Sequence, residues 1–306
     1  MIYAYDDLLN DLKTRKNYFS IGQSVFSREI FAFVKGRGNP HSLIFGGIHA
    51  RECVTADVVM RLYDNYDESL PAICFVPLVN PDGAMLVKYS LDGAEFSSRE
   101  FLKRVNNNST DFSKWKANGR AVDLNVNFDA DFGKGESNVF YPAPENYVGE
   151  RPFSEPETLA MKKLTEKFGF KASMCLHTKG NLIYYGYKKL KCYKNYVKMI
   201  AAATGLPAVT SDGSAGGYKD WFLKNGFGFS ITAELGDDCL FHPISRDYTA
   251  EFAKILENTP KILAKIGDEI WMKSLCAAQS SSQNRDRKST RLNSSHKVQS
   301  RMPSSA

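Results

Sequence analysis

Apolar positions along the chain switch repeatedly between helical and strand spacing. Apolar side chains recur at helical spacing in the segments 5–12 (Tyr5, Leu8, Leu9 and Leu12), 52–66, 154–168, 193–204 and 248–271. Short β-prone runs bounded by glycines or turn residues lie between them, a hairpin in 21–36 and strands in 41–52, 72–83, 171–187 and 226–236. Strands that alternate with helices predict the α/β fold class. We expect a single three-layer α/β/α domain around a central mixed, largely parallel sheet.

Local signals refine the boundaries of these elements. Residues 80–83 read Asn-Pro-Asp-Gly, which predicts a turn. Ser154 is the predicted N-cap of a helix, since Glu157 follows it by three residues. The polar stretch from Leu91 to Arg120 has little periodicity, and we expect it to run over the surface. The last helix is predicted to be long, from Tyr248 to Trp271.

Most of the overall charge of +6 comes from the C-terminal segment. Residues 285–306 contain six Lys or Arg side chains and one acid, so the rest of the chain carries about +1. Residues 286–296, DRKSTRLNSSH, resemble the in-frame translation of a sequencing adapter. We therefore predict a catalytic domain at 1–280 and a disordered, non-native tail at 285–306. The alternative is a basic arm for nucleic acid, but we expect no nucleic-acid partner.

The sequence also bears on location and redox state. It has no uninterrupted apolar run of about 18 residues and no signal-peptide pattern at its start. We therefore expect no membrane segment and a cytoplasmic protein. The six cysteines form no C-x-x-C pair, which excludes zinc-ribbon and thioredoxin motifs and favours reduced thiols. Cys53 and Cys175 are interpreted as small buried side chains.

Metal-type side chains follow several of the predicted strands. His49 and Glu52 are three residues apart where an apolar strand passes into a helix. His177 and Glu234 each close a further apolar strand, and ligands collect at the carboxyl ends of strands in open α/β sheets. Imidazole and carboxylate groups are zinc ligands. Taken alone, His49 and Glu52 could also be a satisfied histidine and a capping glutamate, and His177 could be hydrogen-bonded within a turn.

The order of these motifs resembles the zinc carboxypeptidase family (the carboxypeptidase A superfamily) over nearly all of residues 5–275. The similar segments are GGIHAREC (46–53), NPDG (80–83), WKANGRAVDLNVNFDADFG (115–133), APENYVGERPFSEPET (143–158), LHTKGNLIYYGY (176–187) and TAEL (232–235). GGYKDWF (216–222) resembles the bacterial members that cut the γ-D-glutamyl-diaminopimelate bond of cell-wall peptides.

This resemblance implies the roles of the site residues. One zinc ion per chain would be held by His49, Glu52 and His177, and Glu234 would be the general base. A cation should stabilise the oxyanion of the reaction. Lys116 best matches the family's electrophilic arginine, with Arg120 as the alternative, and both could equally be solvated surface charges.

The substrate-binding segment departs from the family pattern. In the family an Asn-Arg pair binds the terminal carboxylate of the substrate; here Asn125 is present, but Val126 replaces the arginine. A valine cannot form a bidentate contact with a carboxylate. Lys219 falls near the position that sets side-chain preference, and our hypothesis is that it partly replaces the arginine. Tyr218 is a further candidate for this pocket. The alternatives are a lysine on a helix surface and a packed aromatic ring.

Together these features predict a zinc metallopeptidase that acts on peptide or muropeptide substrates, such as the γ-D-glutamyl-diaminopimelate bond. One alternative is a general metallocarboxypeptidase that removes C-terminal residues. Another is a non-catalytic peptide-binding relative, which the intact set of His49, Glu52, His177 and Glu234 argues against. A zinc deacylase of small N-acyl amino acids also uses an H-x-x-E and a distant histidine, but the run of peptidase-like segments disfavours it.

Overall fold

The computed structural model describes residues 1–188, 193–210 and 215–277. The chain divides into two compact units, 1–268 and 269–306, and the first contains the whole sheet. In the second unit, residues 269–277 are helical and mostly exposed. The predicted tail at 285–306 lies outside the described residues. None of the described helices is long and apolar enough to cross a membrane.

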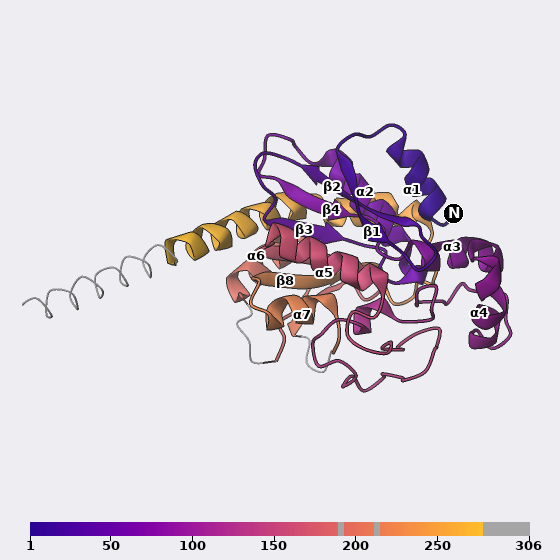
Figure 1. The fold of residues 1–306 in the computed structure, drawn as a ribbon. Coiled ribbons are helices and arrows are strands. Elements are labelled where there is room, and N and C mark those ends of the chain that lie inside the picture. Colours follow the sequence, from indigo (N-terminus) through magenta and orange to yellow (C-terminus); the bar gives the residue numbers. More distant parts are fainter. Residues whose placement is uncertain (189–192, 211–214, 278–306) are drawn as a thin grey trace, which may run out of the picture. The chain divides into compact units, whose positions relative to one another are not determined.

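One mixed sheet organises the first unit (Figure 1). Its strand order is β1-β2-β4-β3-β5-β8-β6-β7. β4, β3, β5 and β8 form its parallel centre. Antiparallel pairs join β1 to β2, β2 to β4 and β8 to β6, whereas β7 is parallel to β6. The strands are β1 Tyr18–Gln23, β2 Glu29–Lys35, β3 Ser42–Phe45, β4 Ile73–Val76, β5 Ala172–His177, β6 Leu182–Tyr185, β7 Ala208–Thr210 and β8 Phe229–Glu234.

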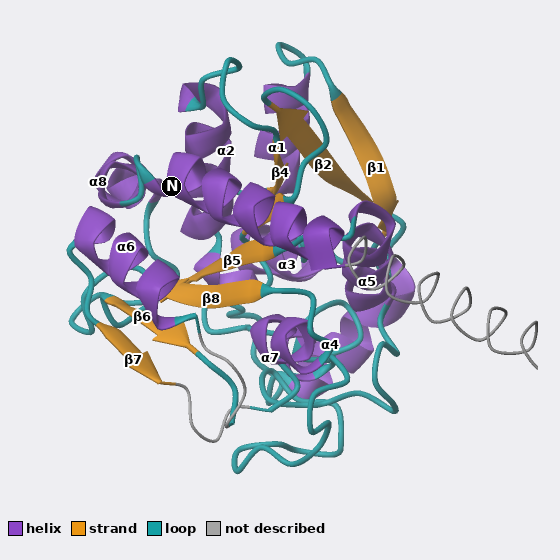
Figure 2. Ribbon diagram, turned by 90° about the vertical axis from the view of Figure 1, so that its left-hand side faces the viewer, coloured by secondary structure: helices purple, strands orange, loops and turns teal. Residues whose placement is uncertain are grey.

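Helices cover both faces of this sheet (Figure 2). The α-helices are α1 Tyr5–Leu12, α2 Val54–Asn65, α3 Pro81–Tyr89, α4 Arg99–Val105, α5 Pro156–Phe168, α6 Lys194–Thr204, α7 Tyr218–Lys224 and α8 Thr249–Ile255. Short 3-10 turns are η1 Ala50–Glu52, η2 Ser90–Gly93, η3 Phe96–Ser98, η4 Leu124–Val126 and η5 Arg246–Tyr248. The predicted α/β/α architecture is confirmed.

The alternation of side chains in β2, β3 and β4 assigns helices to faces. On one face, the ring of Tyr218 in α7 packs 4.7 Å from that of Phe45, and its hydroxyl hydrogen-bonds Thr165 of α5. On the opposite face, Tyr63 of α2 packs 4.9 Å from the ring of Phe33. Because both faces are covered, the central strands are buried throughout, which explains their continuous apolar runs.

The parallel centre of the sheet positions the site. β3, β5 and β8 point the same way, so their carboxyl ends meet at one edge. His177 and Glu234 end their strands and are register partners across the β5–β8 pair. The chain that leaves β3 at Phe45 reaches His49 four residues later. Residues far apart in sequence therefore converge at this edge.

The Asn-Pro-Asp-Gly segment does more than turn the chain, because it also begins helix α3. Asn80 is the N-cap, and its Oδ1 accepts a hydrogen bond of 2.9 Å from the backbone N–H of Gly83. Pro81 takes the first helical position, where no intrahelical N–H is needed. The prediction of a simple turn was therefore incomplete.

The cap predicted at Ser154 is wrong, since the N-cap of α5 is Glu155. A residue before proline is restricted to extended conformations, and Glu155 has φ −92° and ψ 138°. The helix can therefore start no earlier than Pro156. The Ser154 hydroxyl instead donates to Oε1 of Glu155 at 2.8 Å.

The predicted last helix, Tyr248–Trp271, is interrupted. α8 ends at Ile255, and a turn at 256–258 separates it from helical residues that begin at 259. Pro260 explains the break, because it has no N–H and its ring would clash with the carbonyl of Leu256 in a continuous helix.

The stretch 91–120 is also not confined to the surface. It includes α4, and Trp115 and Ala117 near its end are buried. There the N–H of Ala50 donates to the carbonyl of Lys116 at 3.1 Å, which brings this segment beside the chain that carries His49. The expectation of a surface excursion therefore fails for the last part of the stretch.

A buried carboxyl cluster lies where α3 and α5 begin. Asp82 accepts hydrogen bonds from the Ser24 hydroxyl at 2.8 Å and from the Arg28 guanidinium at 2.7 Å. Glu157, which is fully buried, accepts from the N–H of Val25 at 3.1 Å. Burial, together with the charge of Asp82, raises the pKa of Glu157 to about 8.

This raised pKa predicts a pH-dependent stability. Between about pH 4.5 and 8 the unfolded chain has released the Glu157 proton while the folded chain keeps it, so stability falls as pH rises. We expect Glu157→Gln to remove this slope, which is on the order of 1.4 kcal/mol per pH unit in that window. The substitution also changes hydrogen bonding at this site, but that effect on the free energy of unfolding is the same at every pH and does not alter the slope. Urea unfolding at several pH values measures the effect. If plots of the unfolding free energy against pH are parallel for the unaltered protein and Glu157→Gln, the prediction is contradicted.

Candidate metal centre

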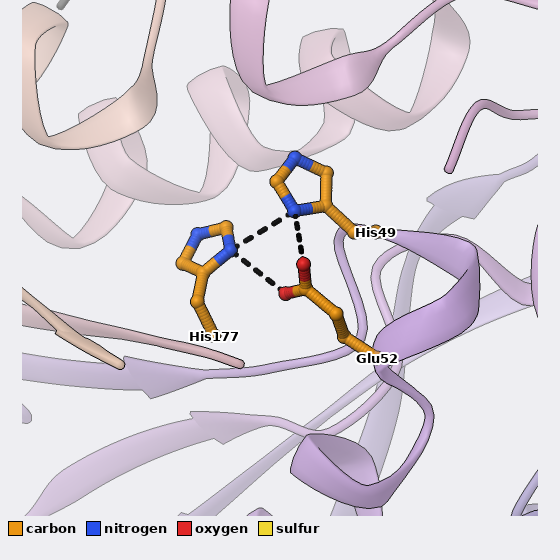
Figure 3. A group of neighbouring side chains, drawn as sticks. All are labelled: His49, Glu52 and His177. Atoms are coloured by element: carbon orange, nitrogen blue, oxygen red, sulfur yellow. Dashed lines mark hydrogen bonds and ion pairs between the residues drawn. The ribbon is translucent and has the colours of Figure 1, made fainter. Parts of the chain in front are cut away.

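Three buried side chains converge at the edge of the sheet (Figure 3). His49 and Glu52 belong to the η1 turn between β3 and α2, and His177 is the last residue of β5. The two oxygens of Glu52 lie 3.0 Å from Nδ1 of His49 and 3.0 Å from Nδ1 of His177. The two Nδ1 atoms are also 3.0 Å apart. The structure thus brings together the three predicted ligands.

The donor set fits a zinc ion. Zinc bonds to nitrogen and oxygen of about 2.0–2.2 Å place tetrahedral ligands about 3.3 Å apart, close to the spacing observed here. Two imidazoles and a carboxylate leave one coordination position open, as catalytic sites require. Burial alone would raise the pKa of Glu52, but His49 and His177 lower it well below its ordinary value, so the carboxylate is ionised as a ligand must be.

Two glycines allow the chain to reach this geometry. Gly47 has φ +59°, and a Cβ there would lie 2.7 Å from Cδ1 of Leu78. A Cβ on Gly46 would lie 2.7 Å from the carbonyl oxygen of Thr55, at the start of α2. The N–H of Gly47 donates to the Thr55 hydroxyl at 2.8 Å. The turn that carries His49 is thereby packed directly against the helix that follows.

Asp123 lies beside the first predicted ligand, and our sequence reasoning gave it no role. Its Oδ1 lies 3.3 Å from Nε2 of His49, the ring nitrogen that faces away from the cluster. The carboxylate is fully buried and also pairs with Lys116 at 3.2 Å. Burial opposes its ionisation, yet Lys116 and His49 lower the pKa of Asp123 below the usual range. The sequence feature that could have pointed to Asp123 is its position two residues before Asn125. That spacing alone does not indicate which residue Asp123 contacts.

Glu234 lies beside His177 and partly faces solvent at the end of β8. Burial raises the pKa of Glu234 to about 7, with the charge of Glu52 adding to the rise and His177 opposing it. A carboxyl group with a pKa near neutrality can both accept and return a proton at physiological pH. The environment of Glu234 is therefore suited to acid-base chemistry.

The two candidate cations occupy different surroundings. Lys116 pairs with Asp123, and its charge lowers the pKa of Glu234, so it lies within electrostatic reach of the cluster. Burial would lower the pKa of Lys116, but Asp123 and Glu52 raise it, which keeps the ammonium charged. Arg120 is instead exposed, with its guanidinium 3.9 Å from a carboxylate oxygen of Glu155. The structure brings Lys116 to the site and not Arg120.

A pocket of about 440 Å³ adjoins Glu234. Asn125, Val126 and Lys219, the predicted substrate-binding residues, are among the residues that line it. Lys219 is buried, so its alternative reading as a surface lysine is wrong. Tyr218 does not line the pocket, because its ring packs in the core against Phe45 and its hydroxyl is bonded to Thr165. Asp220, which sequence reasoning also missed, is buried in the pocket wall.

The fold and the cluster define an α/β metallohydrolase, and comparisons with known proteins place it more closely. The family model described as zinc carboxypeptidase matches residues 2–254. The chain therefore belongs to the zinc carboxypeptidase family and is a zinc metallopeptidase.

Two curated bacterial proteins are similar in sequence. Gamma-D-glutamyl-L-diamino acid endopeptidase 1 of Lysinibacillus sphaericus is 31% identical over 271 residues, which cover 79% of this chain and 68% of that protein. The uncharacterized protein YqgT of Bacillus subtilis (strain 168) is 31% identical over 243 residues, 71% of this chain and 64% of that protein. The chain thus spans about two thirds of the length of these curated relatives.

Solved structures share the fold. Bovine thrombin-activatable fibrinolysis inhibitor has a TM-score of 0.68 and 18% identity, with 89% of this chain and 98% of that chain covered. Murein-tripeptide amidase MpaA from Escherichia coli O157 has a TM-score of 0.58 and 24% identity, with 81% and 92% covered. These likenesses confirm the predicted carboxypeptidase-like fold.

The contact between Asp123 and His49 predicts a role in metal affinity. A carboxylate that holds a ligating histidine typically contributes 10- to 100-fold to metal binding. We therefore expect Asp123→Asn to weaken zinc binding by about 10- to 100-fold, measured by competition with a chromophoric chelator. Asp82→Asn, at an equally buried carboxyl that lies outside the metal cluster, is the matched control. Equal zinc affinity in both variants and the unaltered protein would rule out this role.

Proposed function

We propose that this metallopeptidase hydrolyses the amide bond between γ-D-glutamate and a diamino acid in cell-wall peptides. The sequence relative from Lysinibacillus sphaericus is named for action at that bond, and it supports the proposal. In this reaction one water is consumed. Its oxygen bonds to the carbonyl carbon, the carbon–nitrogen bond breaks, and the leaving nitrogen takes a proton.

The composition of the pocket carries the proposal. Val126 lies in its wall where the family resemblance leads us to expect an arginine for the terminal carboxylate. Among the described residues that line the pocket, Lys219 is the only cation and there is no arginine. The bidentate recognition of a free C-terminus by arginine is therefore missing. This favours a specialised substrate over general carboxypeptidase action.

Each residue of the site has a proposed role. His49, Glu52 and His177 would hold zinc, and Asp123 would orient His49. Bound zinc supplies Lewis acidity, which polarises the scissile carbonyl and makes water more acidic.

Proton transfer and charge stabilisation fall to the chain's own side chains. Glu234 accepts one proton from the attacking water and delivers it to the leaving nitrogen. The ammonium of Lys116, held by Asp123, supplies positive charge for the oxyanion that develops. Asn125 lies 3.5 Å from Nε2 of His177 and lines the pocket, so it is placed to hydrogen-bond the substrate beside the reacting bond.

Removal of the base tests this assignment. We expect Glu234→Gln to lower kcat by about 100- to 10,000-fold, because the amide cannot accept the proton. Zinc affinity should stay unchanged, since Glu234 is not among the clustered donors. Both are measured on the full chain loaded with zinc. A variant that keeps its kcat would remove Glu234 from the mechanism, and one that loses zinc would make it a ligand.

The substrate is tested with L-Ala-γ-D-Glu-meso-diaminopimelate and its C-terminal amide. We expect chelator-sensitive release of free diaminopimelate or its amide, followed by mass spectrometry. Because no arginine binds the terminal carboxylate, kcat/KM for the two peptides should differ by less than about tenfold. Loss of a hydrogen bond to a charged group would lower kcat/KM by about tenfold or more. Cleavage of the acid alone, together with trimming of ordinary peptides, would instead identify a general carboxypeptidase. Binding of peptides without any cleavage would identify a non-catalytic relative.

A further inference from the structure

We propose that Cys175 is a positioning residue of the metal centre. Its sulfur accepts the ring N–H of His177 that faces away from the metal cluster, and it thereby holds this ligand in the orientation that metal binding requires. The inference concerns metal binding and not the substrate, so it does not depend on which peptide bond the enzyme cuts. It gives Cys175 a role beyond that of a small buried side chain.

The two residues share one face of strand β5. Cys175 and His177 are two positions apart on this strand, so their side chains point to the same side of the sheet. Sγ of Cys175 lies 3.0 Å from Nε2 of His177. Only 2% of each residue is exposed, so solvent barely reaches this contact.

Metal binding decides which ring nitrogen of His177 carries the proton. Nδ1 faces the cluster, 3.0 Å from an oxygen of Glu52 and 3.0 Å from Nδ1 of His49. A nitrogen that binds zinc offers its lone pair, so a neutral ring that binds through Nδ1 carries its proton on Nε2. The N–H at Nε2 is buried and therefore needs an acceptor from the protein.

Asn125 cannot be that acceptor. Its Nδ2 lies 3.5 Å from Nε2 of His177, and an amide nitrogen only donates. Rotation of the amide would bring Oδ1 to the ring, but Oδ1 accepts from the backbone N–H of Tyr218 at 3.3 Å, and Nδ2 would then face that second donor. Within the described residues, Cys175 and Asn125 are the two groups at hydrogen-bond distance from Nε2. The sulfur is therefore the acceptor.

The two histidines of the cluster thus have different supporting groups. Nε2 of His49 faces the carboxylate of Asp123 at 3.3 Å, whereas Nε2 of His177 faces a thiol. A ligating histidine usually donates its second N–H to a carboxylate, a backbone carbonyl or water, and a thiol sulfur is a weaker acceptor than these. Cys175 therefore supports His177 mainly by fixing the direction of its ring.

Packing alone does not require this contact. Cys74 on β4 is fully buried and belongs to the same apolar cluster as Cys175. Its sulfur has no hydrogen-bond partner in the part of the chain that the structure describes. The core therefore accommodates a cysteine that only packs, and Cys175 differs from it by its contact with His177.

This difference makes Cys74→Ala the matched control for Cys175→Ala. Each substitution removes one sulfur from the same apolar cluster, so the two variants should lose similar stability in urea unfolding. Only Cys175→Ala removes an acceptor from a predicted metal ligand. Cys175→Ser is the conservative variant, because a hydroxyl can accept the same N–H, although it reaches less far than a thiol.

The main measurement is the zinc affinity of the full chain, by competition with a chromophoric chelator. Loss of the outer partner of a ligating histidine typically weakens metal binding 10- to 100-fold. We expect about tenfold for Cys175→Ala, the low end of this range, because a thiol is a weak acceptor. Cys74→Ala should bind zinc as the unaltered protein does, and Cys175→Ser should regain part of the lost affinity.

A spectroscopic measurement reports on the contact itself. In the zinc-loaded full chain, the proton on Nε2 of His177 should exchange slowly with water, because it is buried and hydrogen-bonded. NMR of protein with isotope-labelled histidine detects this proton, and five histidines give few ring signals. The signal should shift or exchange faster in Cys175→Ala, whereas in Cys74→Ala it should stay as it is.

Two results would overturn the inference. Unchanged zinc affinity in Cys175→Ala would mean that the sulfur does not hold the ligand. An equal loss of affinity in Cys74→Ala would mean that packing of the core, and not the contact with His177, sets the affinity. Both measurements are made without substrate, so either result leaves the proposed function as it stands.

Discussion

The geometry of the catalytic edge depends on one buried side-chain amide, that of Asn80. Its Oδ1 accepts from Gly83 at 2.9 Å, and its Nδ2 donates to the carbonyls of Ile48 at 3.3 Å and Ala117 at 3.0 Å. Asn80 thereby joins the start of α3 to the residues that precede His49 and follow Lys116. A buried backbone group that loses its partner costs about 1–3 kcal/mol, so no apolar side chain could replace this amide cheaply.

The buried carboxylates near the metal cluster differ in the groups that compensate their charge. Each buried carboxylate near the metal cluster contacts a cation or an imidazole: Glu52 contacts both histidines, and Asp123 contacts Lys116 and His49. Glu234 has no such partner among its hydrogen bonds in the described part of the chain, and its pKa is the one that approaches neutrality. In the proposed mechanism the same kind of side chain would thus serve as ligand, orienting group and base because its surroundings differ.

Sequence patterns were sufficient for what depends on local periodicity or on an order of motifs that a known family shares. The helices α1, α2, α5 and α6, the parallel centre of the sheet and the convergence of His49, Glu52 and His177 followed from them, whereas α3, α4, α7 and β7 did not. Boundaries set by proline were misjudged at Ser154 and in the last helix, because the restriction acts on neighbours as well as on the proline itself. The pairing of Asp123 with His49 depends on a tertiary contact that no spacing displays, and the burial of Lys219 and Asp220 in the pocket wall depends on how α7 packs.

The pairing of His177 with Glu234 has a consequence for how such a peptidase can change. Because the two residues are register partners on adjacent strands, the distance between a metal ligand and the base follows from the spacing of about 4.8 Å common to all β-sheets. The pocket wall around α7 belongs to a separate stretch of chain. Residues around α7 can therefore be exchanged without changing the distance between His177 and Glu234, because the β5–β8 pairing sets that distance.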